Sequence, residues 1–340
     1  MDVTELAKQL KTKAPAMVYL VLGTQQVLQE AALTAFMSLI PEDQRVMNVG
    51  RYDMEVTPLA SALADAVSAP FFGERRLVVV NKPYFLTNEK RGGKIEHDLA
   101  ALTKYLQHPE PTTTLVFSAP YEKLDGRKKL VKELKKVAVN VSAAPLDERS
   151  ARQQVESGLH QDGFTIDDAA LETLVQRTNA DYGLMVANVA KLKILAYQNK
   201  QITARMVEEL VPQSLDDNVF DLVTAVLRRD QPRSLALYQQ LLASQKQPLQ
   251  INAVLVSQFR LLIQLKVLVK HGLSQGSIAS KLNVHPYRVK LGLRTVRQFS
   301  LERLANAYLG LVKIERTLKT TQRDPELLFQ LFMLQYTRQN

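Results

Sequence analysis

A short apolar run at residues 17–22 is followed at once by Gly23 and then by residues with helical spacing. A strand, a glycine loop and a helix in this order form the framework in which backbone N–H groups and a lysine bind nucleotide phosphates. The loop reads LGTQQVLQEAAL, with neither a second glycine nor a Lys-Ser or Lys-Thr pair at the helix start. The sequence therefore has the position of a nucleotide loop without the groups that bind phosphate.

Metal and hydrolytic chemistry have no better support in the sequence. The histidines at positions 97, 108, 160, 271 and 285 lack metal-ligand spacing, and cysteine is absent. No Gly-x-Ser-x-Gly sequence occurs. Carboxylate pairs such as Asp167-Asp168 lie at predicted helix ends, where capping and the helix dipole account for them. We therefore expect no catalytic residue, no metal and no cofactor, and no catalysis by this chain alone.

The segment SAPFFGERRLVVV, residues 68–80, places Phe71 and Phe72 between a helix-ending proline and a predicted strand. Adjacent side chains point to opposite faces of a strand and lie about 100° apart on a helix, so one core does not readily take both. The residues alone favour packing of both rings beneath the sheet edge. The alternative is an aromatic anchor for a partner's apolar pocket, with Pro70, Phe71 and Phe72 as its binding residues.

A second candidate site is SIASKLNVHPYRVKLGLRTV, residues 277–296, whose apolar spacing predicts two short helices around a turn at Asn283. In a helix-turn-helix the second helix contacts DNA. Its candidate contacts are Tyr287, Arg288, Lys290, Arg294 and Arg297. The same pattern also occurs in helical domains without a DNA role, so both interpretations stay open.

Charge is distributed unevenly along the 340 residues. Residues 1–140 have a net charge of +3 and residues 141–211 of −3, whereas residues 212–340 hold 18 basic against 8 acidic side chains. A basic last third indicates contact with nucleic acid or an acidic partner, or a solvated basic surface. The sequence shows no run of 18 apolar residues and no signal-peptide core, so we expect no membrane span and a cytoplasmic location.

The elements that position these residues fall into two classes. Up to about residue 143, apolar runs alternate with helical patterns, which predicts a parallel sheet covered by helices on both faces. The predicted strands are 17–22, 46–49, 76–80, 112–118 and 137–141. After Pro145 every periodic segment predicts a helix, first over 147–211 and then, beyond a break at Pro212, over 215–338.

Four segments, in this order, resemble the delta subunit of the bacterial DNA polymerase III clamp loader. They are MVYLVLGTQQVLQEAA, LADAVSAPFFGERRLVVVNKPYFL, GFTIDDAALETLVQRTNADYGLMVANVAKLKIL and HPYRVKLGLRTVRQFSLERLANAYLGLVKIERTLKT. The resemblance covers essentially the whole chain. It implies an AAA+-type fold with a RecA-like α/β domain and a degenerate nucleotide site over residues 1–143, a small helical lid over 144–212 and an all-α collar over 213–340.

The resemblance also implies a function. Delta subunits bind and open the ring-shaped sliding clamp (beta) so that it can be loaded on primed DNA, without productive ATP binding of their own. Their contact is a hydrophobic plug, onto which Phe71 and Phe72 fall, with Phe-Phe in place of the frequent Leu-Phe. The implied partners are the clamp, the tau/gamma and delta prime subunits through the collar, and primed DNA, within the polymerase holoenzyme.

Two other interpretations stay open at this stage. A DNA-binding regulator that uses residues 277–297 as a helix-turn-helix predicts tight binding to a particular duplex without other subunits. An NTPase with an unrecognised loop predicts nucleotide binding at Gly23. The clamp-loader interpretation predicts instead a protein partner, an apolar contact and weak DNA binding by the isolated chain.

Overall fold

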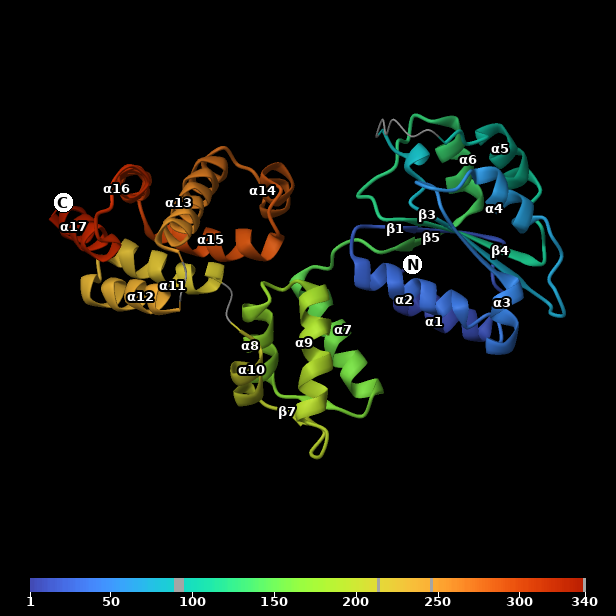
Figure 1. Ribbon diagram of the computed structural model, residues 1–340, viewed down its shortest axis with the longest axis horizontal. Coiled ribbons are helices and arrows are strands. Elements are labelled where there is room, and N and C mark those ends of the chain that lie inside the picture. Colours follow the sequence, from blue (N-terminus) through green and yellow to red (C-terminus); the bar gives the residue numbers. More distant parts are fainter. Residues whose placement is uncertain (89–94, 213–214, 245–246, 339–340) are drawn as a thin grey trace. The chain divides into compact units, whose positions relative to one another are not determined.

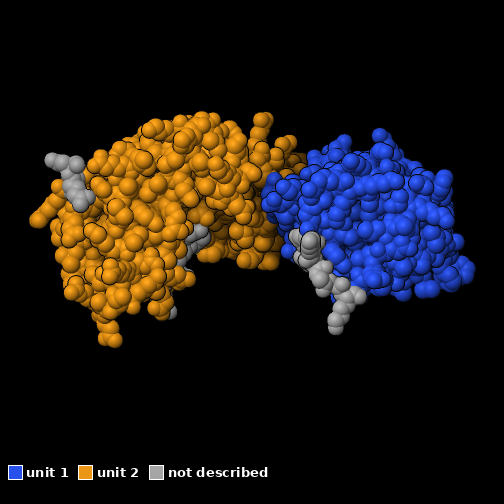
Figure 2. Space-filling model, turned by 90° about the horizontal axis from the view of Figure 1, so that it is seen from above, with its two compact units in different colours: residues 1–145 blue, residues 146–340 orange. Residues whose placement is uncertain are grey.

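The structure, a computed structural model, describes residues 1–88, 95–212, 215–244 and 247–338. The chain divides into two compact units, Met1–Pro145 and Leu146–Asn340. Figure 1 shows the order of their helices and strands, and Figure 2 shows unit 1 in blue and unit 2 in orange. A sheet occupies unit 1, whereas unit 2 is almost entirely helical.

Unit 1 is built on a five-stranded parallel sheet with the order β2-β3-β4-β1-β5. Its strands are β1 Val18–Leu22, β2 Val49–Asp53, β3 Arg76–Asn81, β4 Thr113–Ala119 and β5 Val139–Ser142. The central strands read as nearly continuous apolar runs because both of their faces are covered, as is usual for parallel sheets. The carboxyl ends of β1 and β4 meet, with Leu22 in register with Ala119, directly before the loop at Gly23.

Helices cover both faces of this sheet (Figure 1). On one face lie α1 Val3–Thr12 and α2 Gln26–Met37; on the other lie α4 Leu59–Ala66, α5 Leu99–Gln107 and α6 Lys129–Val137. Alternate strand residues supply the core beneath α4, α5 and α6, including Leu20, Val78 and Phe117. The expected three-layer α/β arrangement is therefore present. Two short 3-10 helices, Glu42–Gln44 and Tyr84–Leu86, complete the unit.

The strand predicted at residues 46–49 is wrong. Residues Arg45–Asn48 form the single helical turn α3, and β2 begins at Val49, which pairs with Leu77 of β3. The β2–β3 ladder begins with the pair of Val49 and Leu77, so residues 46–48 lie outside it. This one turn of helix lies beside the connection that carries the two phenylalanines.

Unit 2 opens with four helices around one apolar cluster. They are α7 Glu148–Gln161, α8 Asp168–Arg177, α9 Tyr182–Leu195 and α10 Ala204–Leu210. Asp147, Asp167 and Asp181 cap the first three, each accepting a backbone N–H three residues on. The sequence predicted no strand here, but Thr165–Ile166 (β6) and Gln201–Ile202 (β7) form a parallel pair. Strands of two residues are too short to produce an alternating pattern.

The rest of unit 2 is a bundle around the long helix α13. Its members are α11 Leu215–Arg228, α12 Gln231–Ala243, α13 Pro248–Lys270, α14 Gln275–Leu282, α15 Pro286–Gln298, α16 Leu301–Thr320 and α17 Pro325–Arg338. By length and a mean hydropathy of 1.4, α13 is the one helix of the described residues that meets the criteria for a membrane span. Several of its apolar side chains, such as Leu255 and Phe259, are fully buried in this bundle, as in the core helix of a helical domain.

Two apolar clusters share unit 2, one within residues 146–211 and one within 219–336. The first also includes Tyr287 and Leu291 of α15, so this helix contributes to both. The division of the chain at residues 143 and 212 into three domains stays a prediction.

Candidate functional site

Phe71 and Phe72 lie on the connection between α4 and β3, and both rings face solvent. Phe71 is 49% exposed and Phe72 is 87% exposed. Their ring centroids are 4.5 Å apart and the rings meet edge to face at 73°, a favourable aromatic geometry. The rings therefore pack on each other outside the core, and the arrangement beneath the sheet edge, which the residues alone favoured, is wrong.

Asn48, the last residue of α3, fixes the backbone of this pair. Its side-chain Nδ2 donates to the carbonyl oxygen of Phe71 at 2.8 Å, and the N–H of Phe71 donates to Asn48 Oδ1 at 2.7 Å. The Asn48 side chain is fully buried. It supplies one donor and one acceptor to the backbone of Phe71, as a neighbouring strand would. The aromatic pair is thus displayed on a backbone held in one conformation.

The conformation of the turn is specific at the next two residues. Phe72 has a φ of +49°, a left-handed conformation that costs a non-glycine residue about 1–2 kcal/mol. At Gly73 an added Cβ would lie 2.5 Å from Gln44 Oε1 and 3.3 Å from Asn48 Nδ2, so the chain passes close to the segment that precedes β2. A strained residue that surrounding contacts hold in place is typical of binding sites.

An ion pair fixes the end of the connection, where the chain enters β3. The Arg76 guanidinium binds the Asp65 carboxylate of α4 and also donates to the carbonyl oxygen of Ala69 at 3.1 Å. Tyr52 of β2 donates to Asp65 Oδ2 at 3.0 Å, and burial followed by this hydrogen bond raises the pKa of the Tyr52 hydroxyl. Both ends of the connection are therefore anchored, and the rings project between them.

The loop after β1 is closed by the protein's own groups. Gln29 of α2 is buried; its amide donates to the carbonyl oxygen of Gly23 at 2.9 Å and accepts from the Ser118 hydroxyl at 2.8 Å. Gly23, with a φ of +147°, lies against the backbone of Ala143, where a Cβ would clash at 2.0 Å. The Gln25 N–H donates to the Ala143 carbonyl at 2.9 Å. The carbonyl oxygen of Gly23 and the N–H of Gln25 are therefore engaged within the protein.

Metal binding has no support in the described part of the chain, where no group of three or more histidine, aspartate or glutamate side chains gathers. His97 has a structural role. Its Nδ1 accepts the N–H of Leu59 at the start of α4, and its Nε2 lies 3.1 Å from the Met54 carbonyl oxygen. Burial holds the pKa of His97 below its usual value.

The segment 277–297 does form a helix-turn-helix, with Asn283 in the left-handed conformation between α14 and α15. Its second helix is largely enclosed. Tyr287 is only 5% exposed, and burial, with Glu148 and Glu172 nearby, raises its pKa to about 12. Lys290 Nζ lies 2.6 Å from Glu148 Oε2 of α7. This environment does not support use of the segment as a sequence-reading module.

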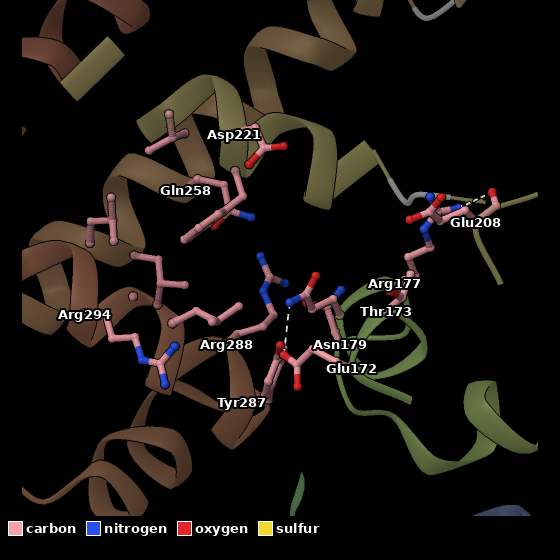
Figure 3. Close-up of a pocket in the computed structure, with 17 residues that line it drawn as sticks. Glu172, Thr173, Arg177, Asn179, Glu208, Asp221, Gln258, Tyr287, Arg288 and Arg294 are labelled. Atoms are coloured by element: carbon pink, nitrogen blue, oxygen red, sulfur yellow. Dashed lines mark hydrogen bonds between the residues drawn. The ribbon is translucent and has the colours of Figure 1, made fainter. Parts of the chain in front are cut away.

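The other candidate residues of α15 divide between a cavity and the surface. Arg288 and Arg294 line a cavity of about 410 Å³ within unit 2, together with Gln258 of α13 and residues of α8. Arg288 and Gln258 extend toward the same space from opposite sides, whereas the guanidinium of Arg294 points away from it (Figure 3). Arg297 is exposed. Tyr287 lines the same cavity as Arg288 and Arg294, whereas Lys290 is paired with Glu148 and Arg297 lies outside the cavity lining.

Two residues that hold these connections in place, Asn48 and Gln29, were not identified from the sequence. Each is a polar residue whose partners are main-chain or hydroxyl groups far away in the chain, 23 residues for Asn48 and up to 90 for Gln29. A weak signal was available, since each interrupts an apolar segment with a side chain able both to donate and to accept hydrogen bonds.

Comparisons with known proteins agree along the whole chain. A family model described as "DNA polymerase III, delta subunit" matches residues 19–144, and one described as its C-terminal domain matches residues 216–336. DNA polymerase III subunit delta of Bacillus subtilis is 38% identical over 339 residues, 99% of this chain and 98% of the relative. A probable delta subunit of Aquifex aeolicus is 25% identical over 263 residues, 76% of this chain and 74% of its own.

A solved structure gives the same result for the fold. The DNA clamp loader delta protein of Bacillus subtilis superimposes with a TM-score of 0.76 at 37% identity, covering 99% of this chain and 100% of that one. The expected fold class, a RecA-like α/β domain followed by a predominantly helical region, is confirmed. By sequence and by fold, the chain belongs to the family of DNA polymerase III clamp-loader delta subunits.

Proposed function

We propose that this delta subunit binds the sliding clamp through Pro70, Phe71 and Phe72 and stabilises its open form, so that the clamp can be loaded on primed DNA. The observation that carries the proposal is the rigid display of two aromatic rings, with Phe72 at 87% exposure. Exposed aromatic side chains on a fixed backbone are the usual anchors of protein interfaces, because little conformational entropy is lost on binding.

The exposed areas are large enough for a tight contact. A phenylalanine buries about 150–250 Å² when it enters a pocket. At about 25 cal/mol per Å², the exposed fractions of 49% and 87% correspond to roughly 2–3 kcal/mol for Phe71 and 3–5 kcal/mol for Phe72 as upper limits. Phe72 is therefore expected to contribute more than Phe71.

The proposed opening of the clamp requires no nucleotide bound to this chain. Gln29 and the backbone of Ala143 occupy hydrogen-bonding groups of the loop at Gly23, and the loop sequence supplies no lysine for a phosphate. Binding alone can shift the clamp toward its open form, provided that the open form binds more tightly. The chain then acts as a protein-binding subunit of the polymerase holoenzyme without catalysing a reaction.

Other partners follow from the family membership. The helical region 213–340 is proposed to join the tau/gamma and delta prime subunits as a collar, and the assembly to act on primed DNA in the cytoplasm. The excess of basic residues in this region favours salt-sensitive contact with DNA phosphates. Among the candidate residues of α15, the exposed Arg294 and Arg297 are the best placed for such a contact.

The test is calorimetric titration of the chain with its cognate clamp. The double variant Phe71→Ala/Phe72→Ala should bind on the order of a thousandfold more weakly, since two interface anchors each contribute about 2 kcal/mol or more. Tyr197→Ala is the matched control, because Tyr197 is 70% exposed in unit 2 and has no proposed role in the contact. Undiminished binding by the double variant would move the contact elsewhere, and no binding by the parent would refute the proposal.

A further inference from the structure

Helix α6 and the segment before it carry a concentration of basic side chains. Residues 121–137 hold seven Lys and Arg against three Asp and Glu side chains, a net charge of +4. Residues 1–140 as a whole have a net charge of +3, so the remainder of this range is slightly acidic. A basic helix of this kind indicates either an anionic partner or a solvated surface.

The start of α6 carries positive charge where helix geometry disfavours it. Lys128 is the N-cap residue and Lys129 the first helical residue, and the first turn contains no acidic side chain. The aligned backbone dipoles make a helix start partly positive, so lysines there are unfavourable and an anion is favourable. By contrast, the carboxylates of Asp2 and Asp98 cap α1 and α5. The helix dipole therefore accounts for the lysines in the last turn of α6 but not for Lys129.

Some of these basic side chains are used within unit 1, but three are not. Lys128 Nζ donates to two backbone carbonyl oxygens at 2.8 and 2.6 Å, and Lys136 pairs with Glu133 at 3.1 Å. The other three lysines of α6 are exposed and form no ion pair within the part of the chain that the structure describes; they are Lys129, Lys132 and Lys135, here called the lysine row.

The lysine row follows the outer face of α6. Its members are three residues apart, so they lie along one ridge of the helix and span about 9 Å of its axis. The opposite face, with Leu130, Val131 and Leu134, is buried in the core of unit 1 and fixes the direction of the row. A DNA strand carries a phosphate about every 3.4 Å along the duplex axis, so the row matches about three successive phosphates.

We propose that the lysine row of α6 binds the phosphate backbone of the DNA on which the assembly acts; the choice of DNA as the anion rests on the proposed function. Every exposed residue from 129 to 136 is a lysine. A protein partner is usually held by apolar or aromatic anchors at the centre of its interface, and the row has none. Lysines act instead as point charges that bind phosphates without reading bases. This contact is separate from the basic region 212–340.

Fluorescence anisotropy of labelled DNA, titrated with the full chain, tests the proposal. Lys129→Gln/Lys132→Gln/Lys135→Gln removes the three charges of the row. At about 50 mM salt we expect this row variant to bind DNA about tenfold more weakly or worse. Each phosphate contact adds about 0.9 to the salt dependence for duplex DNA and about 0.7 for single strands. Between about 50 and 200 mM salt, the affinity of the parent should therefore fall about 40-fold more than that of the row variant for a duplex, or about 20-fold more for a single strand.

The matched control is Lys8→Gln/Lys11→Gln/Lys13→Gln. It removes three exposed lysine charges from α1 and its C-cap, and α1 covers the other face of the sheet (Figure 1). We expect less than a twofold effect on DNA binding, and unchanged thermal stability for both variants because the altered side chains are exposed. Equal weakening by the two variants would trace the effect to net charge and refute the lysine row as a site.

The remaining outcomes separate this inference from the proposed function. A row variant that binds DNA like the parent, or a parent that binds no DNA at about 50 mM salt, refutes the inference and leaves the clamp contact untouched. In calorimetric titrations against the clamp the row variant should match the parent. Loss of clamp binding with DNA binding retained would assign the row to a protein surface and refute the inference. A parent that binds DNA through the row but ignores the clamp overturns the proposed function alone.

Discussion

Asn48→Ala should weaken binding to the clamp without altering any side chain of the proposed contact. The variant loses the hydrogen bonds of 2.8 and 2.7 Å that hold the backbone of Phe71. At about 1 kcal/mol for each bond, the displayed conformation loses about 2 kcal/mol relative to alternatives. The left-handed Phe72, with a φ of +49°, favours relaxation once this restraint is gone.

The consequence for binding follows from the population of the displayed form. When only a fraction of molecules is competent, the apparent dissociation constant rises by the inverse of that fraction. A loss of about 2 kcal/mol therefore weakens binding by up to about thirtyfold. Because the contact itself is intact, the loss should appear in the association rate, whereas truncation of an interface side chain acts mainly on dissociation.

Binding kinetics on immobilised clamp provide the assay, with thermal unfolding as the check on folding. Asn48→Asp is a second variant, because its carboxylate still accepts the N–H of Phe71 but meets the carbonyl oxygen as a buried charge without a proton to donate. It should weaken binding at least as much as Asn48→Ala. An Asn48→Ala protein that unfolds at lower temperature but associates with the clamp as fast as the parent would refute the idea that Asn48 preorganises the contact.

Three further predictions concern the rest of the chain. Gln29→Leu should lower the free energy of unfolding by about 2–3 kcal/mol, because buried hydrogen bonds are lost. ATP should shift the melting temperature of neither the parent nor this variant. An ATP-induced shift in the parent would contradict the conclusion that the loop at Gly23 is closed. Because burial lowers the pKa of His97, the unfolded chain binds a proton at this side chain more readily than the folded chain does. The contribution of neutral His97 to the free energy of unfolding is therefore fully present above pH 6.5 and is lost as the pH falls toward the lowered pKa. His97→Gln should reduce this pH dependence, measured by urea titrations between about pH 7.5 and about pH 5. Gly292→Ala places a Cβ 2.4 Å from Leu265 Cδ1 and should destabilise unit 2 by about 1–3 kcal/mol, measured by chemical denaturation, unless Leu265 can repack.

The sequence predicted those elements whose signals are local. The segment predicted as helical, residues 147–211, does form helices, and Asp147, Asp167 and Asp181 each cap one through a backbone N–H only three residues away. Apolar runs likewise predicted four of the five strands of the parallel sheet close to their observed positions. The exception was residues 46–49, where the apolar Val46 and Met47 suggested a buried strand but face solvent.

The environment of the phenylalanine pair could not be predicted from local signals. Hydrophobicity alone favours burial of Phe71 and Phe72, and their exposure depends on the backbone restraint from Asn48, 23 residues earlier. A hydrogen bond between a side chain and a distant main-chain group leaves no periodic pattern in the sequence. Exposure of the two rings is therefore consistent with the family resemblance, whereas the physical pattern of this one chain favoured their burial.

The proposed opening of the clamp places a specific demand on the surface beside the phenylalanines. Changing a closed clamp from 99% to 1% populated requires the open form to bind about 5.5 kcal/mol more tightly. The two rings can supply roughly 5–8 kcal/mol from their exposed area as an upper limit. Contacts within a pocket that is the same in both forms contribute nothing to this difference. Only contacts that the open clamp makes and the closed clamp lacks can shift the equilibrium. On a frame without bound nucleotide, such contacts must come from residues rigidly joined to the anchor, and α3, held to Phe71 through Asn48, is in that position.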